Sequence, residues 1–211
     1  MMRQILAPSI LSADFKILGE QMALCEKGGA EYLHFDVMDG MFVQNISFGI
    51  PVLESIKGFS GMVLDVHLMV TEPIRYVEAF AKAGADILTV HYEACEDVQA
   101  TLDQIHACGI KAGITIKPDT PVEVLKPYLD QADMFLIMSV KPGQGGQGFI
   151  PESLEKIRVL REMLQERGLD TDIEVDGGIK LENVAEVAKA GANVMVAGSA
   201  VFRGDIEENV S

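Results

Sequence analysis

Four side chains of types that bind metal ions lie in apolar stretches of this 211-residue chain. His34 and Asp36 fall in YLHFDV, His67 falls in MVLDVHLM and Asp176 ends DIEVD, while His91 in ILTVHY is a weaker fifth candidate. Two imidazoles and two carboxylates form a mixed nitrogen and oxygen set that suits zinc, iron, manganese or cobalt better than calcium. Each residue alone has another explanation, as a hydrogen-bonded core histidine or a helix-capping aspartate. Together they predict a divalent metal site, because burying all four without an ion is costly.

Glycine gathers in three segments of the second half of the chain. These are SVKPGQGGQGF at 139–149, DGGI at 176–179 and AGSAVF at 197–202. Such turns expose backbone N–H groups, and glycine lets an anion approach them closely, so the segments predict a phosphate-binding corner. The alternative is that the glycines serve only tight turns with positive φ, which explains one Gly-Gly pair more easily than three segments.

The hydrophobic pattern indicates which elements must position these residues. Short apolar or β-branched runs alternate with amphipathic stretches, as expected when each strand is followed by a helix. We predict strands in QILAPSI, YLHFDV, MVLDVHLM, ILTVHY, KAGITI, MFLIMSV, DIEVDG and VMVAG. Helices are predicted over 15–27, 73–83, 98–108, 151–166 and 181–190.

This order predicts an α/β fold, a (β/α)8 TIM barrel formed by a single domain over residues 1–211. In such a barrel the active site lies at the carboxyl ends of the strands, so the metal-binding candidates and the glycine segments are expected at one rim. His34 and Asp36 should point to the same side because side chains alternate along a strand. The fragments EKGGAEYLHFD, AKAGADILTVH and AKAGANVMVAG each place glycine between a helix and a strand, which supports repeated units.

Composition excludes several other classes of protein. Hydrophobic residues make up 48% and charged residues 23%, which is typical of a globular domain. A formal net charge of -15 argues against nucleic acid or an anionic membrane surface as partner. No stretch approaches the ~20 apolar residues that span a bilayer, and Pro8 and Asp14 come too early for a signal peptide. We therefore expect a cytoplasmic protein whose cysteines, Cys25, Cys95 and Cys108, stay reduced.

Six motifs, SILSADF, HFDVMDGMFVQNISFG, DVHLMV, PGQGGQGFI, VDGGI and GSAVF, occur in this order over nearly the whole chain. In these motifs the chain resembles the ribulose-phosphate 3-epimerase family. The resemblance implies one divalent ion, zinc or iron first with manganese or cobalt as alternatives, held by His34, Asp36, His67 and Asp176. It also implies that Asp36 and Asp176 are the acid and base that exchange the C3 proton of a phosphorylated ketose.

The resemblance extends to the pocket. The methionines Met38, Met69 and Met138 match residues that line the pocket in the family, although as core filler they would need no special role. A homo-oligomer is expected, because the family commonly forms dimers or hexamers. The positions implied to bind substrate are Ser9, His67, Gly143, Gln144, Gly145, Gly146, Gly177, Gly178, Gly198 and Ser199.

Departures from the family pattern leave the sugar open. Gln44 stands where proline is usual and Gln144 where phenylalanine is usual, and both polar groups would suit a six-carbon sugar. We expect conversion of D-ribulose 5-phosphate to D-xylulose 5-phosphate, with D-allulose 6-phosphate to D-fructose 6-phosphate as the alternative.

Two other classes of barrel remain to be compared with an epimerase. One binds phosphorylated ligands without chemistry, as would follow if the metal site were broken. The other isomerises a phosphoribosyl intermediate of amino-acid synthesis and needs no such metal site. The chain also stops at Ser211, soon after the last predicted strand, which predicts either a very short last helix or further residues beyond it.

Overall fold

The strands predicted from the hydrophobic pattern form one parallel sheet in the computed structural model, which describes residues 2–211. The hydrogen-bonded order is β1-β8-β7-β6-β5-β4-β3-β2, so each strand except at one seam lies beside its neighbour in sequence. The strands are β1 (Ile5–Pro8), β2 (Tyr32–Met38), β3 (Val63–Met69), β4 (Ile87–His91), β5 (Lys111–Ile116), β6 (Met134–Met138), β7 (Asp172–Asp176) and β8 (Val194–Ala197).

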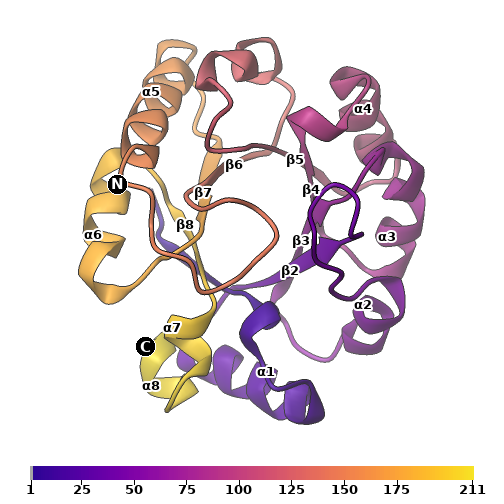
Figure 1. Ribbon diagram of the computed structural model, residues 1–211, viewed down its shortest axis with the longest axis vertical. Helices are drawn as coiled ribbons and strands as arrows, with labels where there is room; N and C mark the ends of the chain where they lie inside the picture. Colours follow the sequence, from indigo (N-terminus) through magenta and orange to yellow (C-terminus); the bar gives the residue numbers. More distant parts are fainter. Residues whose placement is uncertain (1) are drawn as a thin grey trace.

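The seam between β1 and β2 is closed by a single parallel bridge between Ser9 and His34. Figure 1 shows the strands arranged in a ring with the helices around the outside. The prediction of a (β/α)8 barrel is therefore confirmed. The bridge joins Ser9, the first residue of the motif SILSADF, to His34, the first of the four ligand candidates.

Helices separate the strands, as the periodicity predicts, with two differences. The segment between β2 and β3 contains a short helix that was not predicted, and the segment between β5 and β6 forms only a 3-10 helix over Val122–Tyr128. Pro127 lies inside that segment and lacks the N–H that a regular α-helix requires. The helices are α1 (Leu18–Gly28), α2 (Ile50–Ile56), α3 (Val77–Ala83), α4 (Val98–Ala107), α5 (Ser153–Glu166), α6 (Leu181–Ala190), α7 (Ser199–Phe202) and α8 (Ile206–Val210).

The three repeated glycine fragments end helices as expected. Gly29, Gly84 and Gly191 follow α1, α3 and α6 with φ of 103°, 115° and 120°, a region that favours glycine. Each fragment then turns directly into a strand. These turns lie at the amino ends of the strands and therefore away from the rim where chemistry is expected.

Side-chain alternation divides the strands into an outer and an inner face. On β2, Leu33 and Phe35 are fully buried in the apolar layer between sheet and helices, whereas His34 and Asp36 face the barrel interior. A separate apolar cluster, which includes Ile5, Ile87, Met134 and Val194, fills the amino end of the interior. The interior is thus apolar at one end and polar toward the other. In residues 2–211, no helix is long and apolar enough to cross a membrane.

Candidate active site

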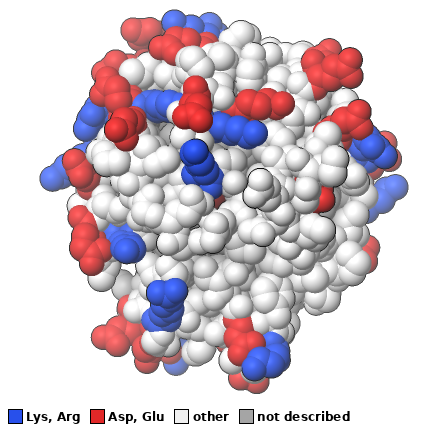
Figure 2. All heavy atoms as spheres, in the orientation of Figure 1, with Lys and Arg blue, Asp and Glu red and all other residues white. Residues whose placement is uncertain are grey.

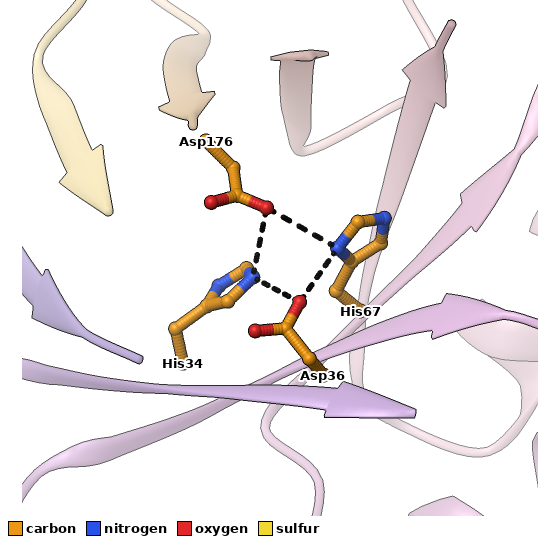
Figure 3. A group of neighbouring side chains, drawn as sticks. All are labelled: His34, Asp36, His67 and Asp176. Carbon is orange, nitrogen blue, oxygen red and sulfur yellow. Dashed lines mark hydrogen bonds and ion pairs between the residues drawn. The ribbon is translucent and has the colours of Figure 1, made fainter. Parts of the chain in front are cut away.

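The four ligand candidates meet at the carboxyl ends of three strands. The register of β2 against β3 places Asp36 beside His67 and places His34 beside Asp65. Asp176 ends β7, and the strands β8 and β1 lie between β7 and β2. Figure 3 shows the side chains of His34, Asp36, His67 and Asp176 pointing toward one another across this space.

Their distances are those of a compact donor cluster. Asp36 Oδ1 lies 3.3 Å from His34 Nε2 and 3.1 Å from His67 Nδ1, and Asp176 Oδ2 lies 4.0 Å and 3.8 Å from the same two nitrogens. One donor atom from each residue lies within 4.8 Å of all the others. Two nitrogens and two oxygens at such spacing fit the four-coordinate N/O sites that bind zinc and related ions.

A polar atom without a partner supports a cation at this place. Nε2 of the fully buried His34 has no hydrogen-bond partner among residues 2–211, although it faces the carboxylates of Asp36 and Asp176. Its Nδ1 is 2.5 Å from Asp65 Oδ2, so Nε2 is the ring nitrogen whose lone pair could bind a metal ion. Ser9 Oγ donates to Asp36 Oδ2 at 2.6 Å and thereby orients that carboxylate. The donor set therefore fits a divalent metal ion.

The two aspartates differ in proton affinity. Burial and then the charge of Asp36 raise the pKa of Asp176 to about 6. Burial alone would also raise the pKa of Asp36, but the charge of His34 and the hydrogen bond from His67 outweigh it and hold this pKa well below its usual range. Asp36 thus stays ionised, whereas Asp176 takes up a proton at about pH 6, a difference that suits an acid and base pair.

A second polar layer, which our sequence interpretation missed, lies beneath the four. Asp65 and Glu174 are fully buried, and Glu174 Oε1 lies 3.4 Å from His34 Nδ1. Burial, followed by the charge of Asp65, raises the pKa of Glu174 well above its usual range. Each acid stands two residues before a predicted ligand on the same strand. This spacing could have indicated that both acids face the barrel interior. His91 lies beyond His67, with their Nε2 atoms 3.0 Å apart.

A cavity of about 370 Å³ opens above the cluster. Asp36 and Asp176 reach it, whereas His34 and His67 are fully buried beneath it. Of the expected substrate-binding residues all but His67 line the cavity, and the methionines Met38, Met69 and Met138 form part of its wall. Gln44 is exposed and is not among the lining residues, so of the two glutamines only Gln144 borders the pocket.

The three glycine segments and several basic side chains also line the cavity. Lys141, Lys180 and Arg203 line it, along with the acidic Glu182, and Arg203 was not anticipated from the sequence. Gly178 has a φ of 66°, and a Cβ there would lie 2.5 Å from the backbone nitrogen of Phe149, so two of the segments are in close contact. The pocket therefore combines the acidic groups of the donor cluster with backbone N–H groups and basic side chains in or beside the glycine segments.

Two loops border the mouth. Asn45, in the loop after β2, donates through Nδ2 to the carbonyl oxygen of Gly143 at 2.6 Å, which joins this loop to the loop after β6. In Figure 1 the loop after β6 crosses in front of the strands. Figure 2 shows that charged side chains gather toward the edge of this face and that much of its centre is uncharged. Most of the acidic side chains visible on this face thus lie away from its centre.

Comparison with known proteins gives a consistent result. The sequence model described as the "Ribulose-phosphate 3 epimerase family" matches residues 5–202. The chain is 54% identical to the ribulose-phosphate 3-epimerase of Synechocystis sp. over 200 residues, which are 94% of this chain and 87% of that protein. It is 51% identical to the enzyme of the same name from Bacillus subtilis over 197 residues, 93% of this chain and 91% of the relative.

Two solved structures of low sequence identity show similarity in fold alone. A mutant tryptophan synthase alpha-subunit from Pyrococcus furiosus superposes with a TM-score of 0.71 at 17% identity, covering 100% of this chain and 98% of the other. A thiamine phosphate pyrophosphorylase from the same organism gives 0.64 at 16% identity, covering 98% and 92%. At such identities the shared barrel says nothing about the reaction.

Proposed function

The chain belongs to the ribulose-phosphate 3-epimerase family, and from this premise we propose that it inverts C3 of D-ribulose 5-phosphate to give D-xylulose 5-phosphate. The observation that carries the proposal is the pair of carboxyls, Asp36 and Asp176, that reach one cavity from opposite sides of the metal-type donor cluster. Epimerisation requires a proton to leave one face of the substrate and a proton to return to the other. Two acid/base groups must therefore flank the reacting carbon.

We assign the ion-binding role to His34, Asp36, His67 and Asp176. A divalent ion held there would supply Lewis-acid stabilisation of negative charge on the substrate oxygens near C3. The unpartnered Nε2 of His34 supports this assignment. Zinc and iron fit the mixed donor set best among the expected ions, with manganese and cobalt as alternatives.

Proton transfer falls to the two aspartates. The ionised carboxylate of Asp36, oriented by the hydroxyl of Ser9, takes the proton from C3 in one direction of reaction. Asp176, whose pKa is raised to about 6, returns a proton from the opposite side, and the two exchange roles in the reverse direction. One oxygen of Asp176 points away from the cluster in Figure 3, which leaves it free to meet the substrate.

The phosphate group would bind at the other end of the pocket. The backbone N–H groups of the segments at 143–146, 177–178 and 198–199, with Lys141 and Arg203 nearby, provide donors and positive charge for it. The five-carbon substrate is favoured over allulose 6-phosphate because Gln44 does not border the pocket and because the relatives are named for ribulose phosphate. Met38, Met69 and Met138 would give the reacting carbons a non-acidic wall.

The proposal is tested with the Asp176→Asn variant. Deuterium wash-in at C3 is followed in parallel for ribulose 5-phosphate and allulose 6-phosphate, with added metal. We expect faster exchange with ribulose 5-phosphate than with allulose 6-phosphate. In the variant the rate of exchange should fall by about 10²–10⁴-fold, because one of the two proton-transfer groups is gone. Asp103→Asn, an exposed aspartate of α4, is the matched control and should exchange like the wild type. Undiminished wash-in for Asp176→Asn would rule out the two-aspartate mechanism.

A homo-oligomer and a cytoplasmic location stay predictions. Met41 and Ile46, in the loop after β2, are 81% and 80% exposed, and burial of such apolar side chains in a subunit contact would be favourable. Size-exclusion chromatography with light-scattering detection would measure the number of subunits in the oligomer.

A further inference from the structure

A buried series of hydrogen bonds leads away from the metal-type cluster through His67. Nδ1 of His67 faces the cluster, 3.1 Å from Asp36 Oδ1, and its Nε2 lies 3.0 Å from Nε2 of His91. Nδ1 of His91 lies in turn 3.3 Å from Oε2 of Glu93. His91 is fully buried, and the ring of Phe42 packs on it with centroids 4.8 Å apart, so bulk water does not reach the middle of the series.

Only one arrangement of hydrogens in this series lets His67 bind a cation through Nδ1. Two facing ring nitrogens 3.0 Å apart share one hydrogen. If Nδ1 of His67 offers its lone pair to an ion, the hydrogen is on Nε2, and His91 must accept it. His91 then carries its own hydrogen on Nδ1 and donates it to Glu93, because a carboxylate can only accept.

Glu93 is fixed in this accepting role by the loop after β5. Its Oε1 accepts from the backbone nitrogen of Lys117 at 2.7 Å and from Oγ1 of Thr120. The ammonium of Lys156 holds the same loop through the carbonyl oxygens of Pro118 and Thr120, each at 2.5 Å. With Oε1 occupied by these donors, Oε2 is the oxygen that remains for His91.

We propose that Glu93 is a positioning residue that sets the tautomer of His67 through His91 and thereby keeps Nδ1 of His67 available for the metal ion. This inference rests on the proposed metal site and adds to it a group that touches neither ion nor substrate. Outer hydrogen bonds of this kind orient ligand imidazoles and tune metal affinity in other proteins.

The Glu93→Gln variant reverses the hydrogen pattern while keeping the size of the side chain. The amide oxygen must accept from the N–H of Lys117, so the NH₂ group is turned toward His91 and donates where the carboxylate accepted. His91 then carries its hydrogen on Nε2, and His67 is driven to carry its own on Nδ1. We expect Zn²⁺ affinity, measured by titration calorimetry of metal-free protein, to fall by roughly 10- to 100-fold.

Thr120→Val is the matched control, because it removes a donor to Glu93 but leaves a carboxylate facing His91. We expect it to bind Zn²⁺ within about threefold of the wild type. In ¹⁵N spectra of the Zn²⁺-loaded wild type, His91 should carry its hydrogen on Nδ1, a readout that does not depend on any variant folding. The opposite tautomer in that spectrum, wild-type affinity in Glu93→Gln, or an equal loss in Thr120→Val would overturn the inference. A wild-type protein that does not bind Zn²⁺ at all would instead overturn the metal site on which it rests.

Discussion

At the scale of single residues, the charges of the site depend on one another because acids and imidazoles share one buried region. Burial alone would lower the pKa of His34, but Asp36, Asp65 and Glu174 outweigh it and raise that pKa well above its ordinary value. Without metal, a protonated His34 therefore provides the positive charge that the carboxylates require. A divalent ion takes over this role only if His34 releases its proton.

This competition predicts a pH dependence of metal affinity. Asp176 has a pKa of about 6 in the metal-free protein, so below pH 6 both it and His34 must lose a proton when the ion binds. Above pH 6 only His34 must do so. Affinity should therefore rise with pH, by about 100-fold per unit below pH 6 and about tenfold per unit above it.

Titration calorimetry in buffers of different ionisation enthalpy would count the released protons. The Asp176→Asn variant serves as the control, since with no carboxyl at this position the steeper limb should disappear. An affinity that stays constant between pH 5 and 7 would show that neither group gives up a proton to the ion.

The candidate ligands were predictable because they are polar residues at alternate positions of apolar strands. His34, Asp36, His67 and Asp176 stood out for this reason, and the register of the strands brings them together. Asp65 and Glu174 also stand at alternate positions of these strands but were missed. In the sequence, an acid beneath a site cannot be told from an ordinary polar residue of an alternating strand. The role inferred for Glu93 could not be predicted at all, because it depends on which nitrogen of His91 faces which neighbour.

At the scale of elements, the turns after β6 and β7 must fit closely to form the phosphate end. Gly178→Ala would force positive φ on an alanine and bring its Cβ to 2.5 Å from the nitrogen of Phe149. We expect KM for ribulose 5-phosphate to rise about tenfold or more and stability to fall by about 1–3 kcal/mol, because the strained turn shifts its N–H groups.

A second glycine of the same region gives the comparison. A Cβ on Gly148 meets nothing within 4 Å, and its φ lies outside the left-handed region, so Gly148→Ala should leave KM nearly unchanged. Steady-state kinetics on both variants checks the pair. Equal KM values for Gly178→Ala and the wild type would mean that this turn does not bind the phosphate.

Strands were more predictable than helices in this chain. Each strand run is apolar and followed by a clear turn. Among the helices, the one over 181–190 was predicted with the bounds that the structure has. The short helix α2 was missed because its seven residues, with proline in the first turn, give too few turns for periodicity to appear. The 3-10 helix over Val122–Tyr128 was missed for the related reason that its repeat is not 3.6 residues.

At the scale of the whole molecule, an ion at this site would join opposite parts of the barrel. His34, Asp36 and His67 come from adjacent strands, whereas Asp176 comes from β7, which β1 and β8 separate from β2. The seam between β1 and β2 has only one backbone bridge. Binding across that seam should therefore stabilise the closed sheet as well as serve the reaction.

Removal of the ion should consequently lower the thermal stability of the barrel. An ion present at about 100 times its Kd contributes about 2.7 kcal/mol. For a domain of this size each kcal/mol corresponds to roughly 2–4 °C, so a chelator should lower Tm by roughly 5–10 °C, and re-added Zn²⁺ should restore it. In Asp176→Asn, where the link to β7 is lost, the chelator should change Tm much less. A wild-type Tm that does not respond to chelator and metal would mean that the ion, if bound, does not hold β7 to β2 and β3.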